Sequence, residues 1–233
     1  MIQNDTETHS SSVIINSIID QAVQIRSLSD RIEFISSSFL GAPYQVNPLV
    51  GSASTPESFT ASISAFDCVT FCETVLALTF SKNGADFNSI LQQIRYKCAQ
   101  ISWLTRNHYM TSWIEENIRN NFIKLDRTFS NATISRLLST LDGYPPQEAT
   151  IYYRPIELFS SYDVIKDATF LLFVSTRSNL DYFHLGIAVR KNDELYLRHA
   201  AKSIGSVNDE LFSNFLARNS MLGITMLEVI EER

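Results

Sequence analysis

The chain has 233 residues, of which 45% are hydrophobic and 11% aromatic, so it can bury a substantial core and is not a disordered protein. Its net charge is −6, from 19 basic and 25 acidic residues. This argues against a nucleic-acid backbone as the main partner, because phosphate neutralisation needs an excess of Lys and Arg. No run of about 18 apolar residues is present, which excludes a membrane-spanning helix. The composition predicts a soluble globular protein.

The first twelve residues are polar and predict an N-terminal tail over 1–12, followed by a single domain over 13–233. They lack the basic and apolar regions of a secretory signal, so the chain is either cytosolic or a form whose signal was removed. Isoleucines then recur at helical spacing on both sides of Ser27–Ser29, which predicts two helices between residues 13 and 39. Further helices are predicted over 68–81, 86–96, 112–122 and 133–141, the first of them ending near Asn83-Gly84.

Beyond about residue 150 the apolar period changes from 3.6 to 2, which is typical of strands. Segments rich in Val, Ile, Phe and Tyr predict strands over 170–175, 182–190, 195–200 and 224–230. A helical first half followed by antiparallel strands predicts an α+β fold, in which the helical N-terminal half packs on an antiparallel sheet from the C-terminal half.

Cys68 is a candidate nucleophile among the three cysteines, Cys68, Cys72 and Cys98. Asp67 is suited to cap a helix, which would place Cys68 in its first turn. The helix dipole there favours thiolate over thiol, whereas a buried, inert cysteine is the commoner fate of a free thiol. Cys72 lies one turn further on and is predicted to be a core residue. The spacing of these residues does not match a structural zinc site.

His184 and His199 lie on two consecutive predicted strands joined by the turn Lys191-Asn192-Asp193. A turn of even length centred between Lys191 and Asn192 would place His199 directly opposite His184, within reach of a hydrogen bond. Phe183, Leu185, Ile187 and Val189 would then form the apolar face. His184, with Gly186 and Ala188, would face the helix that begins at Cys68. A structural, hydrogen-bonded histidine is the alternative for His184.

Six short motifs follow one another along the chain. They are Phe39-Leu40-Gly41-Ala42-Pro43-Tyr44, Phe66-Asp67-Cys68-Val69-Thr70-Phe71, Arg106-Asn107-His108-Tyr109, Trp113-Ile114, His184-Leu185-Gly186-Ile187 and Arg198-His199-Ala200. Together they resemble the N-acetylmuramoyl-L-alanine amidase-like proteins, a branch of the NlpC-type papain-like cysteine hydrolases. The resemblance spans about residues 32–230.

The resemblance implies a papain-like α+β core with Cys68 as nucleophile, His184 as base and His199 as the residue that orients the base. It also implies that Tyr44, Arg106, His108 and Tyr109 line a cleft for a sugar–peptide junction. From the residues alone, Tyr109 also fits simple helix packing and His108 a surface position. Trp113 is best explained by packing. No metal or organic cofactor is implied.

The implied reaction is hydrolysis of the amide between N-acetylmuramic acid and L-alanine, with peptidoglycan or muropeptide fragments as partners and a periplasmic or secreted location. Three alternatives stay open. The first is an endopeptidase that cuts the D-glutamyl–diamino acid bond of the stem peptide, and the second is a host-directed amidase effector. The third, a binding module with a dead triad, is disfavoured because Cys68, His184 and His199 are all chemically competent.

Overall fold

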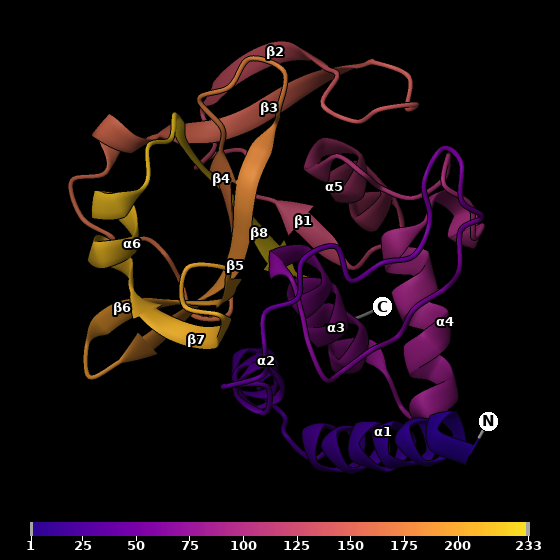
Figure 1. Ribbon diagram of the computed structural model, residues 1–233. Helices are drawn as coiled ribbons and strands as arrows, with labels where there is room; N and C mark the ends of the chain where they lie inside the picture. Colours follow the sequence, from indigo (N-terminus) through magenta and orange to yellow (C-terminus); the bar gives the residue numbers. More distant parts are fainter. Residues whose placement is uncertain (1, 232–233) are drawn as a thin grey trace.

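Helices fill the first half of the chain in the computed structural model, which describes residues 2–231 (Figure 1). They are α1 (Ile2–Ala22), α2 (Leu28–Ser37), α3 (Cys68–Phe80), α4 (Gly84–Arg95) and α5 (Met110–Arg119), with a short 3₁₀ helix, η1, at Lys97–Ala99. No described helix has the length and apolar character needed to cross a membrane.

The second half of the described chain forms one antiparallel sheet of eight strands. The strands are β1 (Ile123–Leu125), β2 (Ala132–Leu138), β3 (Gln147–Pro155), β4 (Phe170–Val174), β5 (Tyr182–Lys191), β6 (Glu194–Ala201), β7 (Ser206–Leu211) and β8 (Gly223–Val229). Their order is β2-β3-β8-β4-β5-β6-β7, and β1 pairs with β8. Short helices at Ile156–Leu158 (η2) and Phe212–Arg218 (α6) interrupt the strands. The predicted α+β arrangement is confirmed.

Apolar side chains pack on both faces of this sheet. Helix α3 lies against β5 and β6 on one face, where Leu185 and Ile187 join the larger core. Helix α6 covers β6 and β7 on the other face, where Ala188 joins a second core with Phe215 (Figure 1). The predicted apolar face is therefore the one that contacts α3. The prediction that His184, Gly186 and Ala188 face α3 is wrong, because α6 covers this side of β5 and Phe215 packs against the His184 ring.

A β-bulge changes the direction of side chains at the start of β5. Val174 pairs with Tyr182 and Phe173 with His184, so Phe183 is the extra residue. Phe183 packs against the second core, on the α6 side, instead of continuing the face of Leu185 as strict alternation predicts. Bulges re-aim side chains in this way and are frequent beside functional sites.

The turn between β5 and β6 is centred one residue later than predicted. Lys191 pairs with Glu194, and Ile187 pairs with Arg198. Both residues of the two-residue turn have positive φ, 49° at Asn192 and 65° at Asp193, as a type I′ hairpin turn requires. Continued, this register places His199 opposite Gly186 and diagonal to His184. Moving the centre of the turn by one residue moves every cross-strand partner by two residues. Because side chains alternate with a period of two, both histidines stay on one face of the sheet.

Three other sequence predictions differ from the structure. The segment predicted as a helix over 133–141 is strand β2, in which exposed Thr133 and Ser135 alternate with more buried residues. Helix α1 begins at Ile2 and includes most of the predicted polar tail over 1–12. Asn83 does not end α3 but caps the start of α4, where its side-chain oxygen accepts from the N–H groups of Ala85 and Asp86.

Candidate active site

Cys68 is the first residue of α3, and its neighbour Asp67 caps the helix as predicted. The Asp67 carboxylate accepts hydrogen bonds from the Thr70 N–H and hydroxyl, both at 2.8 Å, while the Thr70 hydroxyl accepts from the Asp67 N–H at 3.0 Å. This capping box fixes where the helix begins. The Cys68 thiol therefore lies at the N-terminus of the helix, where backbone N–H groups are free of partners within the helix.

The sulfur of Cys68 lies beside the strand that carries His184. The backbone N–H of Leu185, the next residue along β5, is within hydrogen-bonding reach of the sulfur. Burial nevertheless raises the pKa of the Cys68 thiol to about 12, and the Asp67 carboxylate acts in the same direction. The N–H groups of Leu185, Cys68 and Val69 lower the pKa but do not outweigh burial. The resting residue is a thiol, in contrast to the predicted thiolate.

The other two cysteines have different surroundings. Cys72 is fully buried in the core beneath Cys68, as predicted, and burial raises the pKa of its thiol. Cys98 is exposed and lies in the short helix η1 with a left-handed φ of 51°. All three thiols are free. Cys68 is the one that combines a helix N-terminus with a neighbouring histidine-bearing strand.

His184 and His199 form a direct hydrogen bond between their rings. The distance from His184 Nε2 to His199 Nδ1 is 2.6 Å, and the rings are nearly perpendicular, at 87°. Phe215 of α6 packs against both rings, with centroids 5.4 Å from His184 and 5.6 Å from His199. Because the contact uses Nε2 of His184, Nδ1 is the atom available for proton exchange. The predicted hydrogen bond between the two histidines is confirmed, although His199 lies diagonal to His184 and not directly opposite it.

Both histidines are neutral at physiological pH. Burial lowers the pKa of His184 to about 3, and the adjacent His199 contributes to the shift. Burial also lowers the pKa of His199 to about 4, although the Glu210 carboxylate, 3.3 Å from its Nε2, raises it. A neutral imidazole can accept a proton. Each ring therefore carries one N–H and one nitrogen that can accept a proton.

These lowered pKa values predict a loss of stability in acid. An unfolded histidine has a pKa near 6.5, so between pH 6.5 and 4 the unfolded chain binds protons that the folded chain excludes. The free energy of unfolding should fall as pH falls, by up to about 1.4 kcal/mol per pH unit for each such histidine. His199→Gln should make this slope shallower in urea unfolding followed by circular dichroism. An unchanged slope would contradict the burial of a neutral His199.

A pocket of about 430 Å³ adjoins the start of α3, with Asp67 and Val69 in its wall. Arg106 and His108 line it, as predicted. Arg106 forms a 3.0 Å ion pair with Glu57 and lies over the ring of Trp103, 4.7 Å from the centroid. His108 Nε2 contacts the Trp103 carbonyl at 2.7 Å, and burial lowers the pKa of His108 to about 4, so it is a neutral, half-buried group.

The remaining predicted substrate residues differ in position. Tyr44 pairs with Phe66 through its backbone and so lies close to the start of α3. Burial raises the pKa of its phenol, and the nearby Cys68 and Asp67 act in the same direction. Tyr109 is only 2% exposed, and its hydroxyl accepts from the Thr140 N–H at 2.9 Å. The structure therefore places Tyr109 in a packing cluster and not in the pocket wall. Trp113 is fully buried, as predicted.

Comparison with known families identifies the chain. Residues 34–224 match the family model described as N-acetylmuramoyl-L-alanine amidase-like. The chain belongs to this family. The match covers nearly the same segment as the resemblance found in the sequence, and it includes both helix α3 and the hairpin that carries the two histidines. No curated protein matches the chain.

Solved structures share the amidase-like fold. An N-acetylmuramoyl-L-alanine amidase from Bacteroides uniformis is 24% identical and superposes with a TM-score of 0.76 over 87% of this chain and 99% of its own. A Legionella pneumophila protein is 22% identical, with a TM-score of 0.82 and coverage of 96% and 95%. A putative xylanase from Bacteroides fragilis is 23% identical, with a TM-score of 0.75 and coverage of 83% and 98%.

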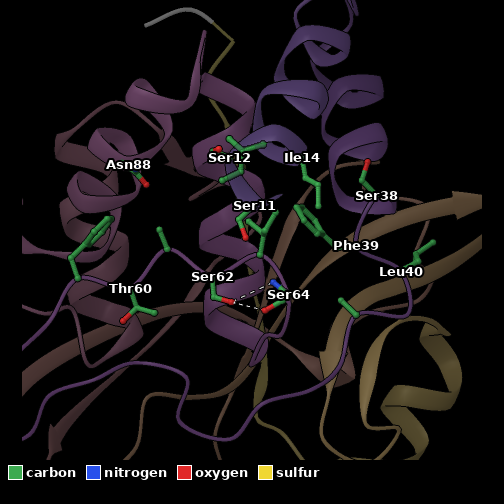
Figure 2. A pocket seen from close by; sticks show the side chains of 15 residues that line it. Ser11, Ser12, Ile14, Ser38, Phe39, Leu40, Thr60, Ser62, Ser64 and Asn88 are labelled. Atoms are coloured by element: carbon green, nitrogen blue, oxygen red, sulfur yellow. Dashed lines mark hydrogen bonds between the residues drawn. The ribbon is translucent and has the colours of Figure 1, made fainter. Parts of the chain in front are cut away.

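A larger pocket of about 1230 Å³ lies away from the histidine pair, between α1, the end of α2 and the segment 59–64 (Figure 2). Serine hydroxyls and apolar side chains form its wall, including Ser11, Ser62 and Phe39. Among the side chains that the structure describes, none of those lining it is titratable. Its size alone does not make it a catalytic site of this amidase-like protein.

Two buried carboxylates near the site were not found from the sequence. Glu210 lies behind His199, and Glu57 holds Arg106. Neither belongs to a motif. Glu210 contacts His199, 11 positions away in the chain, and Glu57 contacts Arg106, 49 positions away. Within the described residues of this amidase-like chain, no cluster of three or more His, Cys, Asp or Glu side chains could hold a metal ion.

Proposed function

We propose that this chain is a papain-like, NlpC-type cysteine hydrolase that cleaves the amide between N-acetylmuramic acid and L-alanine in peptidoglycan or its fragments. Its family membership supports a peptidoglycan amidase-type function. The observation that carries the cysteine mechanism is the contact between the start of α3 and strand β5. The Cys68 sulfur is within reach of the Leu185 N–H, and the adjacent His184 is held by His199.

Attack begins from a neutral thiol and a neutral imidazole. Burial holds the pKa of Cys68 at about 12 and that of His184 at about 3, so a preformed ion pair is disfavoured before substrate binds. His184 Nδ1 takes the thiol proton as the sulfur bonds to the lactyl carbonyl carbon of the muramic acid. The carbonyl oxygen becomes an oxyanion, which the free N–H of Cys68 at the start of α3 would stabilise.

Collapse of this intermediate breaks the C–N bond. The imidazolium of His184 gives its proton to the leaving nitrogen of L-alanine, and the muramyl group stays on Cys68 as a thioester. Water then attacks the thioester carbonyl, His184 takes the water's proton and returns it to the sulfur, and the free acid departs. His199 accepts from His184 Nε2–H throughout and so fixes the orientation of the base.

The pocket beside Asp67 supplies groups for binding substrate. Its wall combines the ring of Trp103 with the side chains of Arg106 and His108. Two buried polar atoms in this wall, Trp103 Nε1 and Asn107 Oδ1, have no hydrogen-bond partner among the described residues. A ring face beside an unsatisfied donor and an unsatisfied acceptor suits a sugar or peptide amide. We place the muropeptide in this pocket, with Tyr44 at its Cys68 end.

This activity implies peptidoglycan or muropeptides as the partner and an extracytoplasmic, periplasmic or secreted location. The test is digestion of a purified muropeptide, with the products weighed by mass spectrometry. The expected products are the free muramic acid moiety and the stem peptide beginning with L-alanine. Release of a peptide that begins with the diamino acid would instead identify the endopeptidase.

The same assay tests the prediction that no metal is required. Protein dialysed against a chelator should cleave the muropeptide at the rate of untreated protein, since a thiol–imidazole pair needs no Lewis acid. Loss of activity on chelation with recovery on adding zinc would contradict the cysteine mechanism.

A further inference from the structure

A carboxylate and a guanidinium follow the histidine pair on the α6 side of the sheet. His199 pairs with Asn208 and Leu197 with Glu210 across β6 and β7, so Glu210 lies diagonal to His199 on the same face. Glu210 is 8% exposed, and its Oε2 lies 3.3 Å from His199 Nε2. Arg218, at the end of α6, donates to both carboxylate oxygens of Glu210 at 2.5 Å. Four side chains thus form a row from His184 to Arg218.

The row determines where the protons of two neutral histidines lie. A neutral imidazole carries one N–H, and a carboxylate only accepts hydrogen bonds. The Nε2 atom of His199 is buried and makes no hydrogen bond with the described residues. Glu210 Oε2 lies 3.3 Å from it, and the negative charge of this carboxylate favours a proton on Nε2. Nδ1 of His199 is then an acceptor, and the 2.6 Å contact must carry the proton of His184 Nε2. Nδ1 of His184 is left without a proton.

We propose that Glu210 is a positioning residue that selects these two tautomers and thereby leaves His184 Nδ1 without a proton, so that it can act as the base for Cys68. The proposal rests on the proposed cysteine mechanism for its effect on rate. Its effect on the tautomers follows from the resting protein alone. Reversed tautomers would put a proton on His184 Nδ1, and this atom could not accept the thiol proton.

Arg218 keeps His199 from becoming charged. A bare carboxylate beside His199 would favour the imidazolium, which carries a proton on both nitrogens and would force the proton of His184 onto Nδ1. Arg218 offsets the charge of Glu210, and it lowers the pKa of His199 while Glu210 raises it.

The other charged groups around His199 are accounted for. Asp209 of β7 also raises the pKa of His199, but its carboxylate is bound by Arg198 at 2.7 and 2.8 Å and by Lys191 at 2.5 Å. His184 faces His199 from β5, and α6 contributes Arg218. Glu210 is bound by Arg218, so replacing Arg218 leaves an uncompensated carboxylate beside His199 and changes the protonation state of that histidine.

The first measurement is the tautomeric state of each histidine, read from two-bond ¹⁵N–¹H couplings in ¹⁵N-histidine-labelled protein without substrate. His184 and His199 should both be protonated at Nε2. Glu210→Gln should change the tautomer of His199, because the introduced amide can donate to Nε2. Glu210→Asp, which keeps the carboxylate, should retain the original tautomers and serves as a second variant if the first does not fold. A proton on Nδ1 of His199 in the unaltered protein would overturn the proposal.

The second measurement is the pH profile of muropeptide hydrolysis. Glu210→Gln should lower kcat by about 10- to 1000-fold at every pH with little change in KM. Arg218→Gln should keep nearly full activity at pH 8 to 9 and lose it as pH falls, because the uncompensated carboxylate raises the pKa of His199. Glu228→Gln, which removes another strand carboxylate held by two basic side chains, is the matched control and should leave both the rate and the tautomers unchanged.

The two readouts separate the possible failures. Unaltered tautomers and kcat in folded Glu210→Gln protein would show that Glu210 is merely structural. If unaltered protein has the expected tautomers but does not cleave the muropeptide, the proposed reaction fails while the role of Glu210 stands.

Discussion

Replacement of Cys68 by alanine or serine is expected to abolish muropeptide hydrolysis, with a fall in kcat of at least about 10⁴-fold. The sulfur is the atom that bonds to the carbonyl carbon, so no other group at the start of α3 can replace it. The fold should survive, since Cys68 is half-buried and the Asp67–Thr70 capping box does not involve its side chain. The measurement is the rate of product formation by mass spectrometry, with circular dichroism to confirm folding.

Cys72→Val is the matched control for this experiment. Cys72 lies one turn further along α3, fully buried in the core, and valine is an apolar residue of similar size. This variant should keep the unaltered rate and lose less than about 1.5 kcal/mol of stability. Full activity in folded Cys68→Ala protein, or its loss in folded Cys72→Val protein, would contradict the assignment of the nucleophile.

Replacement of His184 by alanine should reduce the rate nearly as far as loss of Cys68, because the thiol has no other base. His199→Ala should lower the rate less, by on the order of tens of fold, because His184 remains but is no longer held in one tautomer and orientation. His199→Asn or His199→Gln should recover part of this loss, since an amide oxygen can accept from His184 Nε2–H.

The rates of the His184 and His199 variants on one muropeptide test how much each histidine contributes to catalysis. Thermal unfolding followed by circular dichroism separates loss of function from loss of folding. An unaltered rate in folded His199→Ala protein would mean that the 2.6 Å contact between the histidines has no part in catalysis.

Local features of the site could be predicted from the sequence because they depend on neighbouring residues. The cap at Asp67 uses the N–H group and hydroxyl of Thr70, three positions away, so a short motif is sufficient to place Cys68 at the start of a helix. The shared face of His184 and His199 also follows from the sequence. Strand side chains alternate with a period of two, and the actual pairing differs from the predicted one by two residues.

Features that depend on distant partners could not be predicted. The bulge at Phe183 arises from the pairing of β5 with β4, and the strand at residues 132–138 is stabilised by its pairing with β3. Glu210 is on β7, a strand that the periodicity did not reveal, and its role becomes visible only when β7 pairs with β6. The neutral thiol has the same origin, because burial by the whole fold outweighs the local helix dipole.

The most direct test of the cysteine amidase mechanism is the mass of the covalent intermediate. Unaltered protein is mixed with a muropeptide, quenched in acid within its first turnovers, and digested for peptide mapping by mass spectrometry. The mechanism predicts an N-acetylmuramyl acyl group, attached as a thioester, on the peptide that contains Cys68. An adduct carrying L-alanyl-γ-D-glutamate would move the scissile bond into the stem peptide. An adduct on another residue, or turnover with none on Cys68, would contradict the mechanism.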